Sequence, residues 1–278
     1  MPTKQTILLA LLAMSFSTYA QKITVDKISE NRSTEDGYFS NRCEIDLKLS
    51  GDEVRKYQSV KIGKITKAVD QQGLDLIDPE FNGSYEEISN TAAIAKLKTK
   101  VASRKASVIK ELSGEIKLYN PSESNGGILK IKDFAKKVNT NLTPTLSDTK
   151  VIYITKESYE KIKKDKESTR DAEIQKLPKE AKEVALLLTD LVDAFAYVDF
   201  SGKEAVFIIE GDKSKLVDMY FENAAGKRLD GNGSMISGDV HIYYFNETIK
   251  PTFKMVLQIE SPTAVKTIPF KLTNIDLP

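Results

Sequence analysis

Residues 43–49 read Cys-Glu-Ile-Asp-Leu-Lys-Leu, and apolar and charged side chains alternate through the whole stretch. Successive side chains of a β-strand point to opposite faces of a sheet. The alternation therefore predicts a strand with Cys43, Ile45, Leu47 and Leu49 on a buried face and its charges in water. This is typical of an antiparallel sheet that is covered on one side.

The same kind of signal recurs along most of the chain. Short apolar or alternating runs are separated by turn clusters such as Ser50-Gly51-Asp52 and Asn125-Gly126-Gly127. Many short strands at such spacing indicate a β-sandwich or barrel. Further strands are predicted at residues 23–28, 60–69, 92–97, 107–112, 115–119, 127–134, 197–200, 204–210, 215–221, 240–245, 253–259 and 264–272.

Residues 156–195 change the period of the pattern. The part up to Leu177 is dense in charge and predicts a solvated helix, which Pro178 then interrupts or restarts. Beyond the proline, apolar residues recur every three or four positions, which predicts a helix with one apolar stripe. Such a stripe is expected to pack against a sheet or a facing domain. Its members are Ala181, Val184, Ala185, Leu188, Leu191, Val192 and Phe195.

These patterns predict a mainly β fold of two antiparallel β-sandwiches joined by a helical segment. We expect the N-terminal sandwich over residues 21–150, the helical connector over 151–196 and the C-terminal sandwich over 197–278. One larger α+β domain is the alternative. The strand spacing resembles the immunoglobulin-like sandwiches of exported proteins of Gram-negative bacteria, and this resemblance implies two immunoglobulin-like domains. The chain lacks the Cys…Trp…Cys core of antibody domains, since it has one cysteine and no tryptophan.

Residues 1–20 carry the features of a secretory signal peptide. Lys4 supplies positive charge, residues 7–14 form a short apolar run, and Ser17–Ala20 places small residues before a cleavage site at Gln21. The apolar run is far shorter than the roughly 20 residues of a membrane-spanning helix. We therefore expect a periplasmic or secreted protein with no membrane span after cleavage.

The composition of the exported chain narrows the class of partner. Loss of Lys4 with the signal leaves 40 basic against 40 acidic side chains. Nucleic-acid binding needs a basic face that displaces counterions, so no nucleic-acid partner is predicted. Cys43 is the only cysteine, so the chain cannot form an internal disulfide. Its stability must come from apolar cores, in which Cys43 is expected to act as a small buried residue.

The sequence offers few residues for catalysis. His241 is the only histidine, which excludes two-histidine zinc motifs, and its neighbours predict a half-exposed position in a strand. Ser107 and Lys110, like Ser158 and Lys161, match the S-x-x-K spacing in which a lysine activates a serine. An exported hydrolase that uses such a Ser–Lys pair, or two carboxylates, is the alternative function.

Four acids around one turn are the metal candidates. Asp70, Asp75, Asp78 and Glu80 lie within eleven residues, and weak extracellular calcium sites use such oxygen ligands. Calcium is the only cofactor predicted as a candidate. The favoured function is an exported non-enzymatic binding or structural module of the cell envelope or extracellular space. Its partner is expected to be a protein or an envelope component. A sugar ligand is less favoured, because the chain has no tryptophan to stack on sugar rings.

Overall fold

The computed structural model describes residues 22–33, 41–89, 93–158 and 201–278, together with residues 160, 161, 164 and 168. Within these ranges the chain is mainly β, as predicted, and every strand pairing in its sheets is antiparallel. The signal peptide and the apolar stripe of 181–195 lie outside the described residues. The first residues of the expected connector, 151–154, belong instead to a strand.

The chain forms two compact units, one inserted into the other. Unit 1 comprises Met1–Gly127 and Glu260–Pro278, and unit 2 comprises Ile128–Ile259. This division differs from the boundaries expected at residues 150 and 197. The reason is the last strand, β14 (Val265–Asp276), which pairs with β6 (Val108–Tyr119) of the N-terminal part. The expected C-terminal sandwich therefore loses its last strand to unit 1.

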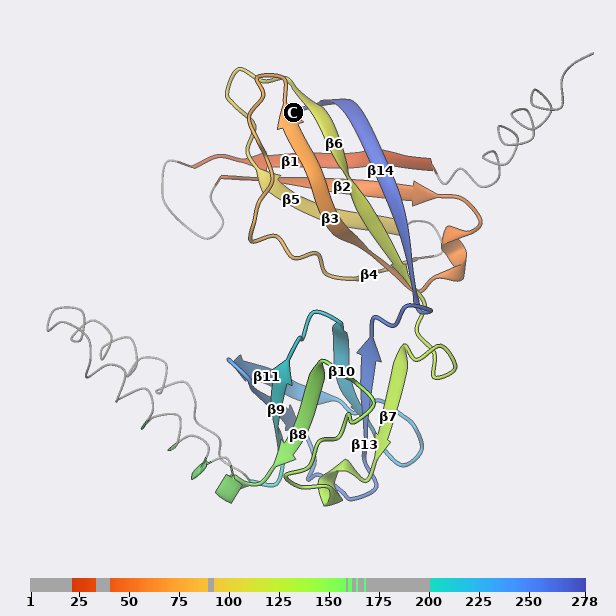
Figure 1. The fold of residues 1–278 in the computed structure, drawn as a ribbon, viewed down its shortest axis with the longest axis vertical. Helices are drawn as coiled ribbons and strands as arrows, with labels where there is room; N and C mark the ends of the chain where they lie inside the picture. The colour runs from red at the N-terminus through yellow and green to blue at the C-terminus, as the bar shows by residue number, and fades with distance from the viewer. Residues whose placement is uncertain are drawn as a thin grey trace, which may run out of the picture. The chain divides into compact units, whose positions relative to one another are not determined.

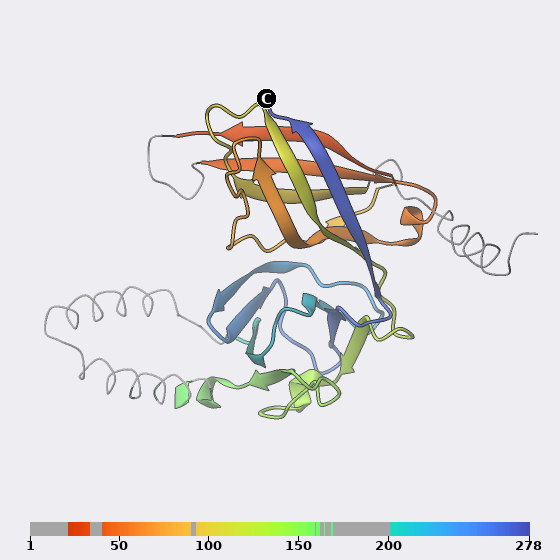
Figure 2. The ribbon, with the colours of Figure 1, turned by 45° about the horizontal axis from the view of Figure 1, so that its top comes forward.

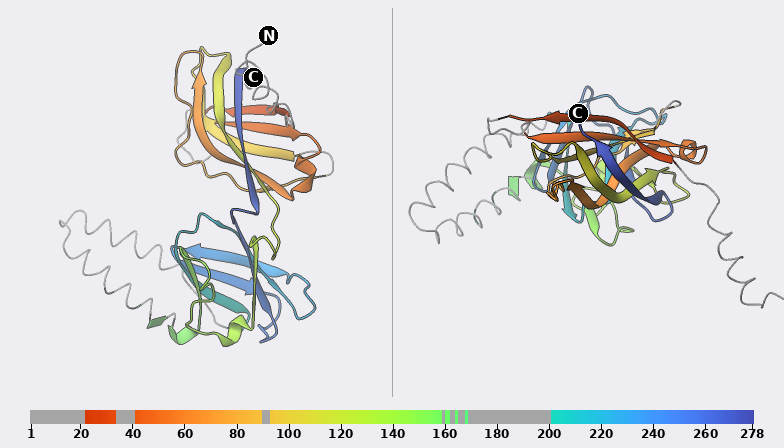
Figure 3. Two further views of the ribbon diagram at one scale, coloured as in Figure 1. Left: turned by 45° about the vertical axis from the view of Figure 1, so that its right-hand side comes forward. Right: turned by 90° about the horizontal axis from the view of Figure 1, so that it is seen from above.

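Unit 1 is built from two sheets that enclose one core, and their strands cross one another in Figure 1. The first sheet, which we call sheet A, contains three strands in the order β1-β2-β5, and the second, sheet B, contains four in the order β14-β6-β3-β4. Figure 3 (left) shows blue β14 beside yellow-green β6 in one layer, and red-orange β1 and β2 in the other. The strands not yet bounded are β1 (Lys22–Asn31), β2 (Arg42–Ser50), β3 (Ser59–Asp70), β4 (Glu86–Glu87) and β5 (Ala93–Lys100).

The alternation that predicted the first strand is confirmed in β2. Cys43, Ile45, Leu47 and Leu49 are all buried, whereas the residues between them are partly exposed. Sheet B supplies the facing side of the core, chiefly through β6, in which Ile109, Leu112, Ile116 and Leu118 are buried. A 3-10 turn (Val54–Lys56) joins β2 to β3 and adds Val54 to the same core.

Unit 2 also pairs a three-stranded sheet with a four-stranded one. Sheet C has the order β10-β13-β7 and sheet D the order β11-β12-β9-β8. This strand order differs from that of unit 1. A 3-10 turn (Phe134–Lys136) follows β7. The strands are β7 (Ile128–Lys132), β8 (Thr149–Ile154), β9 (Glu204–Gly211), β10 (Leu216–Glu222), β11 (Gly231–Ser237), β12 (Val240–Phe245) and β13 (Lys254–Ile259).

Aromatic rings fill the core of unit 2. Phe134 and Phe207 are fully buried with ring centroids 5.8 Å apart, and Phe221 lies 5.5 Å from Phe134. Tyr153 meets Phe134 edge-on at 5.4 Å. Such tilted and edge-on pairs add stability beyond the burial of their area. The aromatic cluster therefore forms the centre of the core of unit 2.

The chain passes between the units twice, just before β7 and just after β13. Hydrogen bonds within unit 1 hold both of these segments in place. The carbonyl oxygen of Asn125 accepts bonds from Ser261 Oγ (2.6 Å) and Thr263 Oγ1 (2.7 Å). The hydroxyl of Tyr119, itself buried, donates to the carbonyl oxygen of Gly127 at 3.1 Å. The residues that precede β7 and follow β13 are therefore held against the end of sheet B.

Candidate functional site

The acids predicted as calcium ligands serve the fold of unit 1. Asp70 ends β3 and is fully buried. One of its oxygens accepts the backbone N–H groups of Gln72 (2.8 Å) and Leu74 (2.9 Å), and the other accepts that of Ser103 (2.9 Å). Burial alone would raise the pKa of Asp70, but these backbone bonds outweigh it and hold the pKa below its usual value. Both oxygens of the carboxylate are therefore already engaged by the chain itself.

The other three acids are not gathered around Asp70 into a metal site. Asp75 Oδ1 accepts the N–H of Ile77 (3.0 Å), and Asp78 Oδ1 accepts the N–H of Glu80 (3.0 Å), so both stabilise local turns. Among the residues that the structure describes, no three His, Cys, Asp or Glu side chains are grouped so that they could hold a metal ion. The calcium prediction thus gains no support from the geometry.

The residues predicted for Ser–Lys chemistry are placed in surface positions. Ser107 precedes β6 and lies 3.3 Å from Gln71 Oε1 through its hydroxyl, while Lys110 is an exposed residue of the strand. Ser158 lies near the start of a helix, where Thr155 Oγ1 accepts its N–H at 3.4 Å, and Lys161 is exposed. No hydrogen bond joins serine to lysine in either pair within the described part of the chain.

His241 differs from expectation. It lies in β12 opposite Phe207, only 7% exposed rather than half-exposed, because it points toward the core of unit 2. Its Nε2 has no hydrogen-bond partner among the described residues. Burial lowers the pKa of His241, and the positive charge of Lys213 lowers it further. These features are those of a neutral imidazole that fills space in the core.

A charged cluster that the sequence did not reveal lies at the end of sheet B. Glu260, with a side chain 8% exposed, contacts Lys61 Nζ and Lys117 Nζ at 2.5 Å each, one through each oxygen. The hydroxyl of Tyr85 donates to the same carboxylate at 3.1 Å, and Lys61 lies 4.6 Å from the centre of the Tyr85 ring. Burial would raise the pKa of Glu260, but the two lysines outweigh it and lower the pKa. The cluster anchors the chain where it re-enters unit 1.

Each side of the unit 1 sandwich has a line along which an edge of sheet A faces an edge of sheet B, and we call this line a seam. The seam between the edges of β3 and β5 is covered by the loop that follows β3. Leu76 in this loop is extended and bonds both sheets: it donates its N–H to Ala68 in β3 (2.8 Å) and accepts that of Lys100 in β5 (2.9 Å). Its side chain is only 1% exposed and belongs to the core. This loop therefore covers the seam by bonding to the edges of two strands, one from each sheet.

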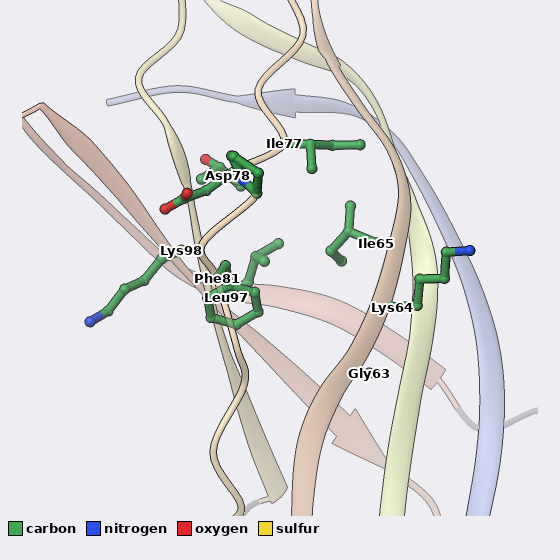
Figure 4. A pocket seen from close by; sticks show the side chains of 10 residues that line it. Gly63, Lys64, Ile65, Ile77, Asp78, Phe81, Leu97 and Lys98 are labelled. Atoms are coloured by element: carbon green, nitrogen blue, oxygen red, sulfur yellow. The ribbon is translucent and has the colours of Figure 1, made fainter. Parts of the chain in front are cut away.

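A cavity of about 210 Å³ remains beneath this covering loop. Figure 4 shows Ile65 of β3, Ile77 and Phe81 of the loop, and Leu97 of β5 around the space, while the amino groups of Lys64 and Lys98 extend away from it. The wall is therefore mixed, because Asp78 and Thr99 line the cavity together with these apolar side chains, and the covering loop leaves the space beneath it unfilled.

The opposite seam, between β1 and β14, has no such cover within the described residues. Each of these strands is the last of its sheet, as Figure 2 shows for blue β14. Between them lies an open groove of about 560 Å³. Its walls carry apolar side chains that are only partly buried against the core, together with Ile275, which is 8% exposed. They are Ile23, Val25, Ile28, Leu272, Ile275 and Leu277.

Comparison of the chain with known protein families, curated proteins and solved structures finds no match. Among the described residues there is also no helix of the length and hydropathy needed to cross a membrane. The candidate site is therefore defined by geometry alone, as the open groove of unit 1.

Proposed function

We propose that this chain is an exported, non-enzymatic binding module that takes an extended segment of a partner protein into the groove between β1 and β14. The observation that carries the proposal is the contrast between the two seams of unit 1. The seam at β3 and β5 is covered by a loop segment that buries Leu76 and bonds both edges. The seam at β1 and β14 also has apolar side chains in its walls, and none of the described residues covers it.

The groove fits a strand better than a compact ligand. A segment added to the edge of β1 would bond its backbone to that edge and turn every second side chain into the groove. The walls have the matching period, since Ile23 and Val25 are two residues apart, as are Ile275 and Leu277. The preferred segment is therefore one in which apolar and polar residues alternate.

Two further features indicate that the groove takes up a partner protein and not a second copy of this chain. Pro269 lies within β14 and removes a backbone donor, and β1 has a bulge at Asp26. Proline and bulges interrupt the regular edge that two copies would need in order to pair along the whole length of these strands, which leaves room for a shorter segment beside residues 22–25 of β1. The part of β14 that lines the groove, residues 272–276, lies beyond the proline.

We further propose that unit 1 is an immunoglobulin-like sandwich whose last two strands have been separated by unit 2. Its sheet orders, β1-β2-β5 and β14-β6-β3-β4, follow the A-B-E and G-F-C-C′ orders of that architecture. In this reading the groove lies between the first and last strands of the sandwich. The proposed export of the chain rests on the signal peptide predicted at residues 1–20.

The test uses the exported chain, residues 21–278, and a nine-residue peptide in which valine alternates with lysine or threonine. We expect the peptide to shift the NMR signals of β1 and of residues 272–277. A peptide of the same composition with its valines in one block is expected to bind at least about tenfold more weakly. Val25→Asp, in the groove wall, should abolish binding. Thr267→Asp, an exposed change on β14 outside the groove, should leave it intact.

Three outcomes would contradict the proposal. Equal binding of both peptides, or binding that survives Val25→Asp, would show that the groove does not read an extended strand. Binding of phosphatidylglycerol vesicles that is lost in Val25→Asp, with no response to either peptide, would assign the groove to a lipid instead.

A further inference from the structure

β11 differs in charge from every other strand that the structure places at the end of a sheet. Its sequence over residues 231–237 is Gly-Asn-Gly-Ser-Met-Ile-Ser, with no charged residue and no proline. The other end strands, β1, β5, β14, β4, β10, β7 and β8, each contain at least one lysine, aspartate or glutamate. Charges of this kind keep strand edges from pairing with other chains. The edge of β11 lacks that protection.

This edge also presents backbone groups to which a further strand can bond. A two-residue turn, Gly238-Asp239, joins β11 to β12, so Ser237 and Val240 lie opposite each other and exchange both N–H···O bonds. Bonded pairs alternate with pairs that make no bonds, so Ser234 and Ile236 direct their N–H and C=O groups away from β12. No described strand or loop takes up these groups.

The side chains along the edge leave it accessible. Ile236 is 62% exposed, and among the described residues it is the more exposed of two large apolar side chains in water, the other being Leu74 at 46%. Gly233 and Ser234 are small and exposed as well. A strand that pairs here would cover part of Ile236 and meet no bulky obstacle beside it.

A second copy of the same edge fits these features best. Two identical strands can pair antiparallel around a two-fold axis. The bulge between Gly231 and Gly233 confines the regular ladder to residues 233–237, whose centre is Met235. With the axis at Met235, Ser234 lies opposite Ile236 of the second copy, and the outward groups of both residues form about four hydrogen bonds in all. Like charges nowhere meet in this register, whereas a different protein finds no charge on β11 to recognise.

We propose that β11 pairs with β11 of a second copy of this chain, so that sheet D continues across a two-fold axis at Met235. The contact involves only about five residues of each strand, so the dimer is reversible and forms at high protein concentration. Because the pairing uses the same edge of both copies, it stops at two chains. It concerns unit 2 and does not depend on the groove of unit 1.

The test measures both the assembly and its location in the exported chain, residues 21–278. Sedimentation velocity should show a monomer–dimer equilibrium, and the amides of Ser234 and Ile236 should exchange more slowly as the dimer fraction rises. Ser234→Pro removes an outward N–H and keeps the bonds to β12, so it should weaken the dimer at least about tenfold. Ile236→Lys places a charge on the edge and should weaken it similarly. Leu74→Lys, the matched change of an exposed apolar residue in unit 1, should leave it unchanged.

Several results would overturn the proposal. A chain that stays monomeric at millimolar concentration would show that β11 does not pair with itself. Slow exchange of Ser234 and Ile236 that is independent of concentration would assign the edge to another segment of the same chain. A dimer that survives both Ile236→Lys and Ser234→Pro, or one that Leu74→Lys weakens equally, would place the contact elsewhere. If Ser234→Pro does not fold, Ile236→Lys alone decides. Peptide binding at the groove is a separate measurement, so either proposal can fail alone.

Discussion

Replacing Asp70 with asparagine isolates the role of the one fully buried carboxylate among the predicted calcium ligands. The substitution keeps the shape of the side chain and removes its charge and one acceptor atom. In the native turn three backbone N–H groups, from Gln72, Leu74 and Ser103, point at the two carboxylate oxygens. An asparagine oxygen can still accept two of them, but its amide nitrogen would then face the third donor.

The expected loss follows from these three bonds. A hydrogen bond to a charged group contributes about 1.5–3 kcal/mol and a neutral one about 0.5–1.5 kcal/mol, so two weakened bonds account for about 2 kcal/mol. The buried N–H of Ser103, left facing another donor, adds about 1–3 kcal/mol. We expect Asp70→Asn to destabilise unit 1 by ~3–5 kcal/mol. For a unit of this size that is a fall of roughly 10 °C in Tm.

Urea unfolding followed by circular dichroism measures this loss, and a second turn in the chain provides the control. Asn223 makes the corresponding bond, accepting the N–H of Lys227 at 3.0 Å, in a partly exposed turn. Asn223→Ala should cost only about 1 kcal/mol. If Asp70→Asn costs under 1 kcal/mol, or no more than Asn223→Ala, the carboxylate does not hold this turn as described.

The same substitution predicts a pH dependence of definite sign. The pKa of Asp70 is lower in the folded chain than its unfolded value of about 3.9. Its contribution to stability is therefore complete above pH 4 and is lost as the pH falls from there toward the folded pKa. The difference in stability between wild type and Asp70→Asn should accordingly shrink below pH 4. A difference that stays constant to pH 2 would contradict the reasoning.

Calcium should leave Tm unchanged when added at millimolar concentration, because the Asp70 oxygens are already taken; a clear rise in a calorimetric scan would reverse that conclusion. His241 has a folded pKa below its usual value of about 6.5, so unit 2 should lose stability as the pH falls below 6.5, and His241→Phe should remove that dependence in urea titrations. Glu260→Gln should cost ~2–3 kcal/mol because it leaves two half-buried lysines without a counter-charge, and an unchanged urea midpoint would refute this. Trypsin cleavage after Lys161 should leave two fragments that run together in gel filtration, since β14 lies on one fragment and β6 on the other; separation without denaturant would contradict their pairing.

Alternation in the sequence predicted a strand correctly where one face of that strand packs on the core and the other faces water. The alternation at 43–49 was confirmed because every second side chain of β2 meets the core. Turn chemistry was also readable, and it explains a similarity between Asp70-Gln71-Gln72-Gly73 and Asn223-Ala224-Ala225-Gly226. In both turns the first side chain accepts the N–H four residues on, and the glycine has a positive φ, 86° and 82°. The match reflects a shared turn, since the strand orders of the two units differ.

The candidate site could not be predicted in the same way. Its walls join residues 23–28 to residues 272–278, which are brought together only by the folded sandwich. The cluster around Glu260 likewise gathers Lys61, Tyr85 and Lys117 from strands and loops far apart in the sequence. Charged residues are common along this chain, so no spacing distinguishes these four before the sheets are paired. The prediction that His241 is half-exposed was wrong for a related reason. Alternation shows which residues share a face of a strand, but it does not show which face meets the core.

The boundary between the two units is set by the pairing of strands that lie far apart in the sequence. Tyr119 at the end of β6 lies opposite Val265 at the start of β14, so the two strands form a hairpin in space whose connecting loop contains all of unit 2. Such an insertion costs little in the folded state, because its ends already lie side by side and closure entropy grows only slowly with loop length. Its consequence is kinetic. Unit 1 cannot complete sheet B until β14 has been synthesised, after the whole of unit 2. Until then β6 has an open edge, and the cover of Ile116 and Leu118 remains incomplete. The groove beside β14 therefore cannot form before β14 has paired with β6.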